Sequence, residues 1–130
     1  MTLTVTTTIS GSEITTITKG AQIVVDAYDV VDETSIATLA SDYEVALSPG
    51  TETLLKIVMF WLDAYEEKTP GTPDCTFKVH TAGGAAIALE APVILIRGQD
   101  DFFGEFDLAF LANLGDNTRK FSAFIGRTIA

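Results

Sequence analysis

The sequence predicts a mainly β fold, either an antiparallel β-sandwich or a jelly-roll-like barrel of about ten short strands. Apolar and polar residues alternate in segments such as 21–27, 77–81 and 121–125, which is the period of a half-buried strand. Turn-forming residues recur at short intervals between these segments. We expect residues 1–130 to form a single β-rich domain, since this length can build one core without disulfides or a metal.

The first 18 residues are rich in threonine, and a turn signal at Ser10-Gly11-Ser12 divides them. Before this turn, Leu3, Val5 and Ile9 alternate weakly with polar residues. We expect residues 1–18 to form an extended arm or an edge hairpin, and Lys19-Gly20 to break the chain before the next strand.

The segment after that strand is acidic, and residues 29–33 are expected to form a loop. Two further strands are predicted at 35–39 and 43–47, and they would meet at a turn formed by Ala40-Ser41-Asp42.

The longest apolar run of the chain covers residues 54–62 and is interrupted only by Lys56. We favour a central strand here, because the run is rich in β-branched and aromatic residues and includes the only tryptophan, Trp61. The alternative is an α+β fold with a helix at 52–67, in which Thr51 would cap the helix.

The last third contains two predicted pairs of neighbouring strands. Residues 86–89 would pair with 93–96. Residues 106–112 would form a hairpin with 121–125 across the turn Leu114-Gly115-Asp116-Asn117.

The composition excludes several partners. The formal net charge of -10 and the eight lysines and arginines disfavour direct binding of nucleic acid, which needs concentrated positive charge. No apolar run approaches the roughly 20 residues of a membrane-spanning helix, so we expect no membrane association. The N-terminal sequence lacks the features of a signal peptide, which predicts synthesis in the cytoplasm.

No catalytic or cofactor motif is present in the sequence. His80 is the only histidine and lies on the polar face of a predicted strand, and Cys75 is the only cysteine. Neither has the neighbours in sequence that a catalytic triad, a thiol-disulfide site or a zinc site requires. We therefore expect no enzymatic activity, no catalytic residues and no cofactor.

Calcium is the most credible ligand, because hard cations prefer several oxygen donors. The candidate donors are four acidic residues in and beside the predicted loop, Asp26, Asp29, Asp32 and Glu33. They lack the spacing of an EF-hand, so a solvated acidic loop is the favoured interpretation and no metal site is assigned.

Two stretches are similar to those of small virion proteins of tailed phages. They are the opening Thr2-Leu-Thr-Val-Thr-Thr-Thr-Ile and the closing Asn117-Thr-Arg-Lys-Phe-Ser-Ala-Phe-Ile-Gly-Arg, in a chain of dense short strands with few basic residues. This resemblance implies a location in the virion, after synthesis in the host cytoplasm. It implies the role of a capsid decoration (cement) protein or of a tail or neck subunit.

These observations favour a non-enzymatic protein that functions by packing against other protein subunits. Hydrophobic residues make up 47% of the chain and the mean hydropathy is +0.30, which suggests apolar surface covered by partners. We expect a homo-oligomer, or attachment to a capsid or tail lattice. The predicted interface residues are Leu3, Val5, Ile9, Phe102 and Phe103. The alternative is a calcium- or carbohydrate-binding β-sandwich module.

Overall fold

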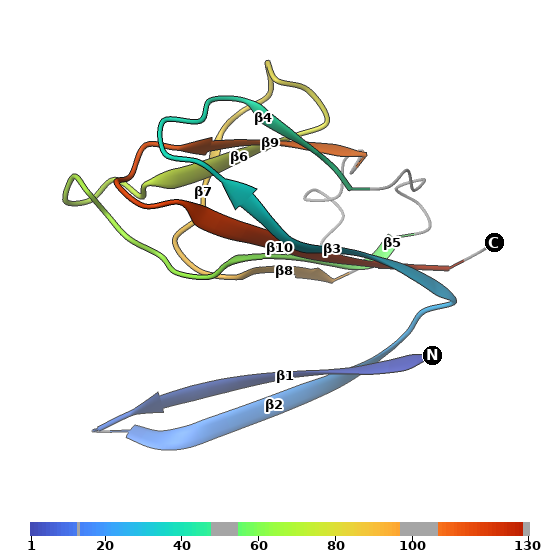
Figure 1. Cartoon of the computed structure of the whole chain (residues 1–130). Helices are drawn as coiled ribbons and strands as arrows, with labels where there is room; N and C mark the ends of the chain where they lie inside the picture. The colour runs from blue at the N-terminus through green and yellow to red at the C-terminus, as the bar shows by residue number, and fades with distance from the viewer. Residues whose placement is uncertain (13, 48–54, 97–106, 129–130) are drawn as a thin grey trace.

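The computed structural model describes residues 1–12, 14–47, 55–96 and 107–128, and its regular elements are all β-strands (Figure 1). The predicted mainly β fold is therefore confirmed. The strands are β1 (Thr2–Gly11), β2 (Ile14–Val24), β3 (Ala27–Ile36), β4 (Tyr43–Ala46), β5 (Leu55–Leu62), β6 (Cys75–Val79), β7 (Ile87–Ala88), β8 (Val93–Ile96), β9 (Leu108–Asn113) and β10 (Arg119–Arg127).

Eight of these strands form a sandwich of two antiparallel sheets. One sheet has the order β3-β10-β5-β8 and the other has the order β4-β9-β6-β7. The pairs are nested along the chain, because β3 pairs with β10, β4 with β9, β5 with β8 and β6 with β7. This eight-stranded arrangement has the connectivity of a jelly roll.

The space between the two sheets is filled by a single apolar core. Three aromatic rings lie at its centre, one from each of three strands. The ring centroid of Phe60 lies 5.1 Å from that of Phe77 and 5.9 Å from that of Phe121. All three side chains are buried, so this cluster joins the two sheets.

The apolar run at 54–62 forms the interior strand β5, between β10 and β8. The helix alternative at 52–67 is wrong for the residues that the structure describes, since 55–62 are extended. Val58, Phe60 and Leu62 enter the core, whereas Met59 and Trp61 are half-buried on the opposite face. The tryptophan is thus outside the core, because the two-residue period of a strand separates it from Phe60.

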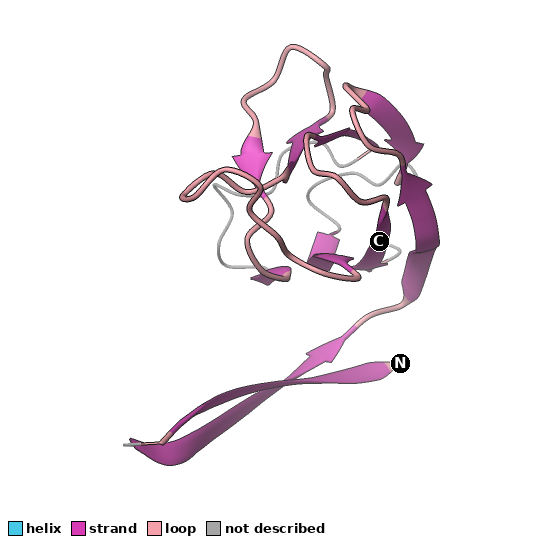
Figure 2. Cartoon of the chain, turned by 60° about the vertical axis from the view of Figure 1, so that its left-hand side comes forward, coloured by secondary structure: helices cyan, strands magenta, loops and turns pink. Residues whose placement is uncertain are grey.

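The strands β1 and β2 form a separate two-stranded sheet that projects from the sandwich (Figures 1 and 2). The hairpin extends beyond the expected residues 1–18, since Thr2 pairs with Val24 at the open end, and it is a sheet of its own and not the edge of a larger one. The break expected at Lys19-Gly20 is wrong. Strand β2 continues through these two residues because they pair with Thr7 and Thr6 of β1.

The acidic segment 29–33 is part of the edge strand β3, and the predicted loop is wrong. Asp32 and Glu33 form a β-bulge opposite Ser122, where the pairing with β10 shifts register. Glu33 has a positive φ of 43°, and its N–H donates to Ser122 Oγ at 3.2 Å. Charged residues and a bulge on an edge strand discourage pairing with another sheet edge.

The strand expected at 35–39 ends at Ile36. Leu39 has a φ of 63°, which lies in the left-handed region and turns the chain toward the other sheet.

Both strand pairs predicted in the last third are wrong as pairs, although their strands exist. Strand β7 belongs to the β4-β9-β6-β7 sheet, whereas β8 belongs to the opposite sheet. The turn at 114–117 likewise joins β9 to β10 across the sandwich. Asn113 stabilises this crossing, because its buried Nδ2 donates to the carbonyls of Ile36 at 3.1 Å and Asn117 at 2.9 Å.

Candidate functional site

The β1-β2 hairpin has two different faces. Cross-strand pairing joins Leu3 to Ile23 and Val5 to Ala21, which places these positions on one side of the ribbon. Leu3, Val5 and Ile23 are half-buried. The opposite side carries exposed polar residues, chiefly Thr2, Thr4, Thr6, Thr8, Thr18 and Gln22. By the same register, Thr7 and Lys19 are on the first side and Val24 is on the second. The hairpin is therefore an amphipathic ribbon whose apolar face consists of Leu3, Val5, Ala21 and Ile23, near its base, and whose other face, the threonine face, is mainly threonine.

Backbone hydrogen bonds close the open end of the hairpin and join it to strand β10 of the sandwich. The N–H of Val25 donates to the carbonyl of Met1, and the Met1 ammonium group donates to the carbonyl of Val25, both at 2.9 Å. The N–H of Asp26 donates to the carbonyl of Arg127 at 2.8 Å. Val25 is fully buried beside Gly126 and Ile57, on the outward side of the β3-β10-β5-β8 sheet.

We call this outward side, which is turned away from the core, the outer face of the β3-β10-β5-β8 sheet. One row of aligned residues crosses all four strands on it. Val30 pairs with Phe124, Phe124 with Met59, and Met59 with Ile94. All four are apolar, and Val30 and Ile94 are 54% and 39% exposed.

The next row on the same face continues the apolar surface. Tyr28 pairs with Gly126, Gly126 with Ile57, and Ile57 with Ile96. The Tyr28 ring is 53% exposed and stacks on Phe124 with a centroid distance of 5.6 Å. The two rows contain no charged residue, and Lys56 lies beside Ile96 where the sheet faces the hairpin.

A groove of about 290 Å³ separates the hairpin from this face. It is lined on the hairpin side by Gln22, Ile23 and Val24, and on the sheet side by Lys56 and Ile96. The groove shows that the hairpin leaves the sheet soon after its base and does not cover the outer face.

Negative charge is distributed unevenly along the chain. Residues 1–24 contain one acidic residue, Glu13, and one basic residue, Lys19. The formal net charge of -10 therefore belongs entirely to residues 25–130. The hairpin is the neutral segment of an otherwise acidic molecule.

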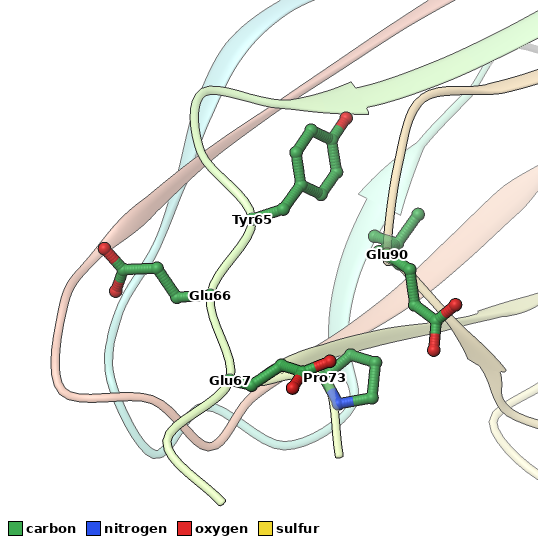
Figure 3. Close-up of a pocket in the computed structure, with 6 residues that line it drawn as sticks. Tyr65, Glu66, Glu67, Pro73 and Glu90 are labelled. Atoms are coloured by element: carbon green, nitrogen blue, oxygen red, sulfur yellow. The ribbon is translucent and has the colours of Figure 1, made fainter. Parts of the chain in front are cut away.

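A second, smaller pocket of about 160 Å³ lies at one end of the sandwich (Figure 3). Its lining residues are Tyr65, Glu66, Glu67, Pro73, Leu89 and Glu90. Figure 3 shows the Glu66 carboxylate pointing away from Glu67 and Glu90. Glu67 Oε2 accepts a hydrogen bond from the Gly71 N–H at 3.0 Å. These carboxylates do not converge on one point, as a pair acting on a glycosidic bond would need to do.

Two ionisable groups near this end of the molecule have pKa values that their surroundings shift. The pKa of Glu66 is lowered by hydrogen bonds from Arg119 and Asn117 and by the charge of Arg119. Burial raises the pKa of the Cys75 thiol to about 11, so this buried cysteine is a protonated structural residue at neutral pH.

The four calcium candidates are distributed along β3 and its start. Asp29 forms an ion pair with Arg127, and Glu33 lies 3.8 Å from the ammonium group of Lys120. Asp26 precedes the strand, and Asp32 lies in the bulge. Within residues 1–12, 14–47, 55–96 and 107–128, no three histidine, cysteine or acidic side chains form a group that could hold a metal ion.

His80 is exposed, as expected, and its Nδ1 lies 2.8 Å from Asp107 Oδ1. This hydrogen bond lowers the pKa of Asp107. His80 has a φ of 72°, and it lies in the turn after β6.

In the described part of the chain, no helix is long and apolar enough to cross a membrane.

The structure places Leu3 and Val5 on the apolar face of the hairpin. Phe102, Phe103 and the side chain of Ile9 lie outside the described residues. Sequence reasoning missed the outer face, whose row is Val30, Phe124, Met59 and Ile94. Its signal was present, because β5 and β8 are apolar at successive positions and so have apolar residues on both faces.

Comparison with known proteins gives no relative from which to transfer a function: no protein-family model, curated protein or solved structure matches this chain.

Proposed function

We propose that this protein is a non-enzymatic structural subunit that acts by packing against other protein subunits, with the β1-β2 hairpin as its principal contact element. The observation that carries this proposal is the projecting amphipathic ribbon, which stands outside the eight-stranded sandwich (Figure 2).

A two-stranded ribbon is at best marginally stable by itself in water, and it normally needs another layer against its apolar face. None of the hairpin side chains that the structure describes, Leu3, Val5 and Ile23 among them, belongs to the core cluster of the sandwich. Burial of these side chains against another subunit would supply the missing layer. The hairpin is thus suited to a contact between molecules.

Within this class, we propose a virion component, such as a capsid decoration protein or a tail or neck subunit. The threonine-rich opening and the closing strand, which are similar to those of small virion proteins of tailed phages, support this proposal. The jelly-roll connectivity is compatible with it by analogy of fold, since viral capsid domains use this topology. Lectin domains use the same topology, so the hairpin carries more weight than the fold.

Analytical ultracentrifugation of the full chain, from low micromolar to near-millimolar concentration, tests the assembly role. We expect a concentration-dependent oligomer. Val5→Lys should raise its dissociation constant roughly tenfold or more, because it places a charge on the apolar face of the hairpin. Thr6→Lys is the matched control, because it adds the same charge to the threonine face.

A chain that stays monomeric at every concentration would overturn the assembly role. Equal effects of Val5→Lys and Thr6→Lys would show that the apolar face of the hairpin is not the contact. The virion location is tested separately, by mass spectrometry of purified phage particles from cells that carry the coding sequence. Detection only in the particle-free fraction would contradict it.

A further inference from the structure

We infer that the outer face of the β3-β10-β5-β8 sheet is the docking surface for the β1-β2 hairpin of a second copy of this chain. This inference rests on the proposed assembly function and names the partner. In the resulting dimer, each hairpin would lie across the outer face of the other molecule, as one more β layer on its sandwich.

The first support is the chemistry of the receiving surface. The row Val30, Phe124, Met59 and Ile94 crosses the whole sheet without a charged or polar side chain. Its two ends are 54% and 39% exposed in the isolated chain. An apolar row of this extent on a sheet face is typical of a surface that another β layer covers.

The second support is that the outer face already receives apolar side chains from the base of the hairpin. Val25 is fully buried against Gly126 and Ile57. Ile57 points outward, yet it is 1% exposed because Val25 covers it. The proposed interface would extend this intramolecular contact from the second row to the first row of the same face.

The chain's own hairpin does not make this contact. Beyond its base it is separated from the sheet by the groove lined by Ile23, Lys56 and Ile96. The hydrogen bond from Asp26 to Arg127 holds the base on the sandwich, and Figures 1 and 2 show the ribbon running below the sandwich, at a distance from it beyond this base. Its apolar face is therefore available to the outer face of another molecule.

Charge favours a second copy as the occupant. Two copies that approach through their sandwiches each bring the full formal charge of -10, which repels. The hairpin segment 1–24 has no net charge, and the aligned rows of the outer face contain no charged side chain. Contact between the hairpin and these rows joins two parts of the molecule that carry no net negative charge, and so avoids this repulsion at the point of contact. Reciprocal exchange gives a closed twofold dimer.

Lysine substitutions in the outer face test this inference. Ile94→Lys and Val30→Lys should each raise the dissociation constant of the full chain roughly tenfold or more, measured by analytical ultracentrifugation. Ile87→Lys is the matched control, since it changes a 48% exposed isoleucine on an edge strand of the opposite sheet. Each lysine lowers the net negative charge, so weaker association cannot come from added repulsion between copies.

A double-mutant cycle tests whether the hairpin and the outer face contact each other. The combined variant Val5→Lys/Ile94→Lys should change the dissociation constant by a factor that differs from the product of the two single effects, because both lysines then lie in the same contact. Circular dichroism and thermal melting of each variant confirm that it is folded.

The outcomes distinguish the two proposals. If the full chain associates and Val5→Lys weakens it, while Ile94→Lys and Val30→Lys behave as the unmodified chain, the docking surface is wrong and the assembly function stands. If both kinds of variant are defective but their effects multiply in the combined variant Val5→Lys/Ile94→Lys, the hairpin and the outer face do not contact each other, and the inference is overturned. A chain that is monomeric at all concentrations overturns both proposals.

Discussion

Val25 occupies the space that a side chain on Gly126 would need. A Cβ atom at Gly126 would lie 2.8 Å from Val25 Cγ1 and 2.9 Å from Ile57 Cγ2, both closer than normal van der Waals contact. The glycine in β10 therefore allows the base of the hairpin to lie directly on the outer face of the sheet.

Gly126→Ala should destabilise the protein by about 1 to 3 kcal/mol, because the added methyl group overpacks this contact. Val25 Cγ1 and Ile57 Cγ2 are short branches close to their backbones, so they can move away only if the strands shift. Urea denaturation measures the stability, and faster amide exchange at Val25 would show that the base of the hairpin has loosened. Gly83→Ala is the control, since a Cβ there meets nothing within 4 Å. Equal stability of the two variants would contradict this view of the hairpin base.

Phe60 and Trp61 are neighbours in sequence but should differ in their contributions to stability. Phe60→Ala should cost about 3 to 5 kcal/mol, because the ring is fully buried between Phe77 and Phe121. Trp61→Ala should cost only about 1 to 2 kcal/mol, because the indole is half-buried on the outer face. Urea denaturation followed by circular dichroism measures both, since Trp61 is the only tryptophan and its loss removes the fluorescence signal. Equal costs would place Trp61 in the core.

The ion pair between Glu66 and Arg119 predicts a pH dependence of stability. Arg119 lowers the pKa of Glu66 in the folded protein, so the ionised carboxylate stabilises the fold above the ordinary pKa of glutamate. This contribution disappears as the pH falls through the lowered pKa. The difference in melting temperature between the unmodified chain and Glu66→Gln should be largest at neutral pH and should shrink in acid.

The matched background for this measurement is Arg119→Met, which removes the charged partner. In that background, Glu66→Gln should leave the pH profile of the melting temperature nearly unchanged. A difference between the unmodified chain and Glu66→Gln that stays constant from neutral to acidic pH would rule out the ion pair as its cause.

The sequence was sufficient to predict most of the strands, because the side chains of a strand alternate between two environments and leave a two-residue period. The hairpin turn after Ser10 and the strand at 55–62 follow from this period and from local turn chemistry. Leu3 and Val5 were identified for the same reason, as apolar positions that alternate with threonine. The bulge at Asp32-Glu33 was missed because acidic residues occur both in loops and on edge strands.

The pairing of the strands was decided by the tertiary structure. Strands that are close in sequence, such as β7 and β8 or β9 and β10, lie in opposite sheets. Strand β7 pairs with the preceding strand β6, but the partners of β8, β9 and β10 include strands distant along the chain, and in the β3–β10 pair Val30 faces Phe124. Local patterns specify which residues are extended, but the shared core of two sheets selects their neighbours. The apolar runs of β5 and β8 indicated that both faces of these strands are apolar, but the row of Val30, Phe124, Met59 and Ile94 exists only after four separate strands have come together, so its members could not be identified from the sequence.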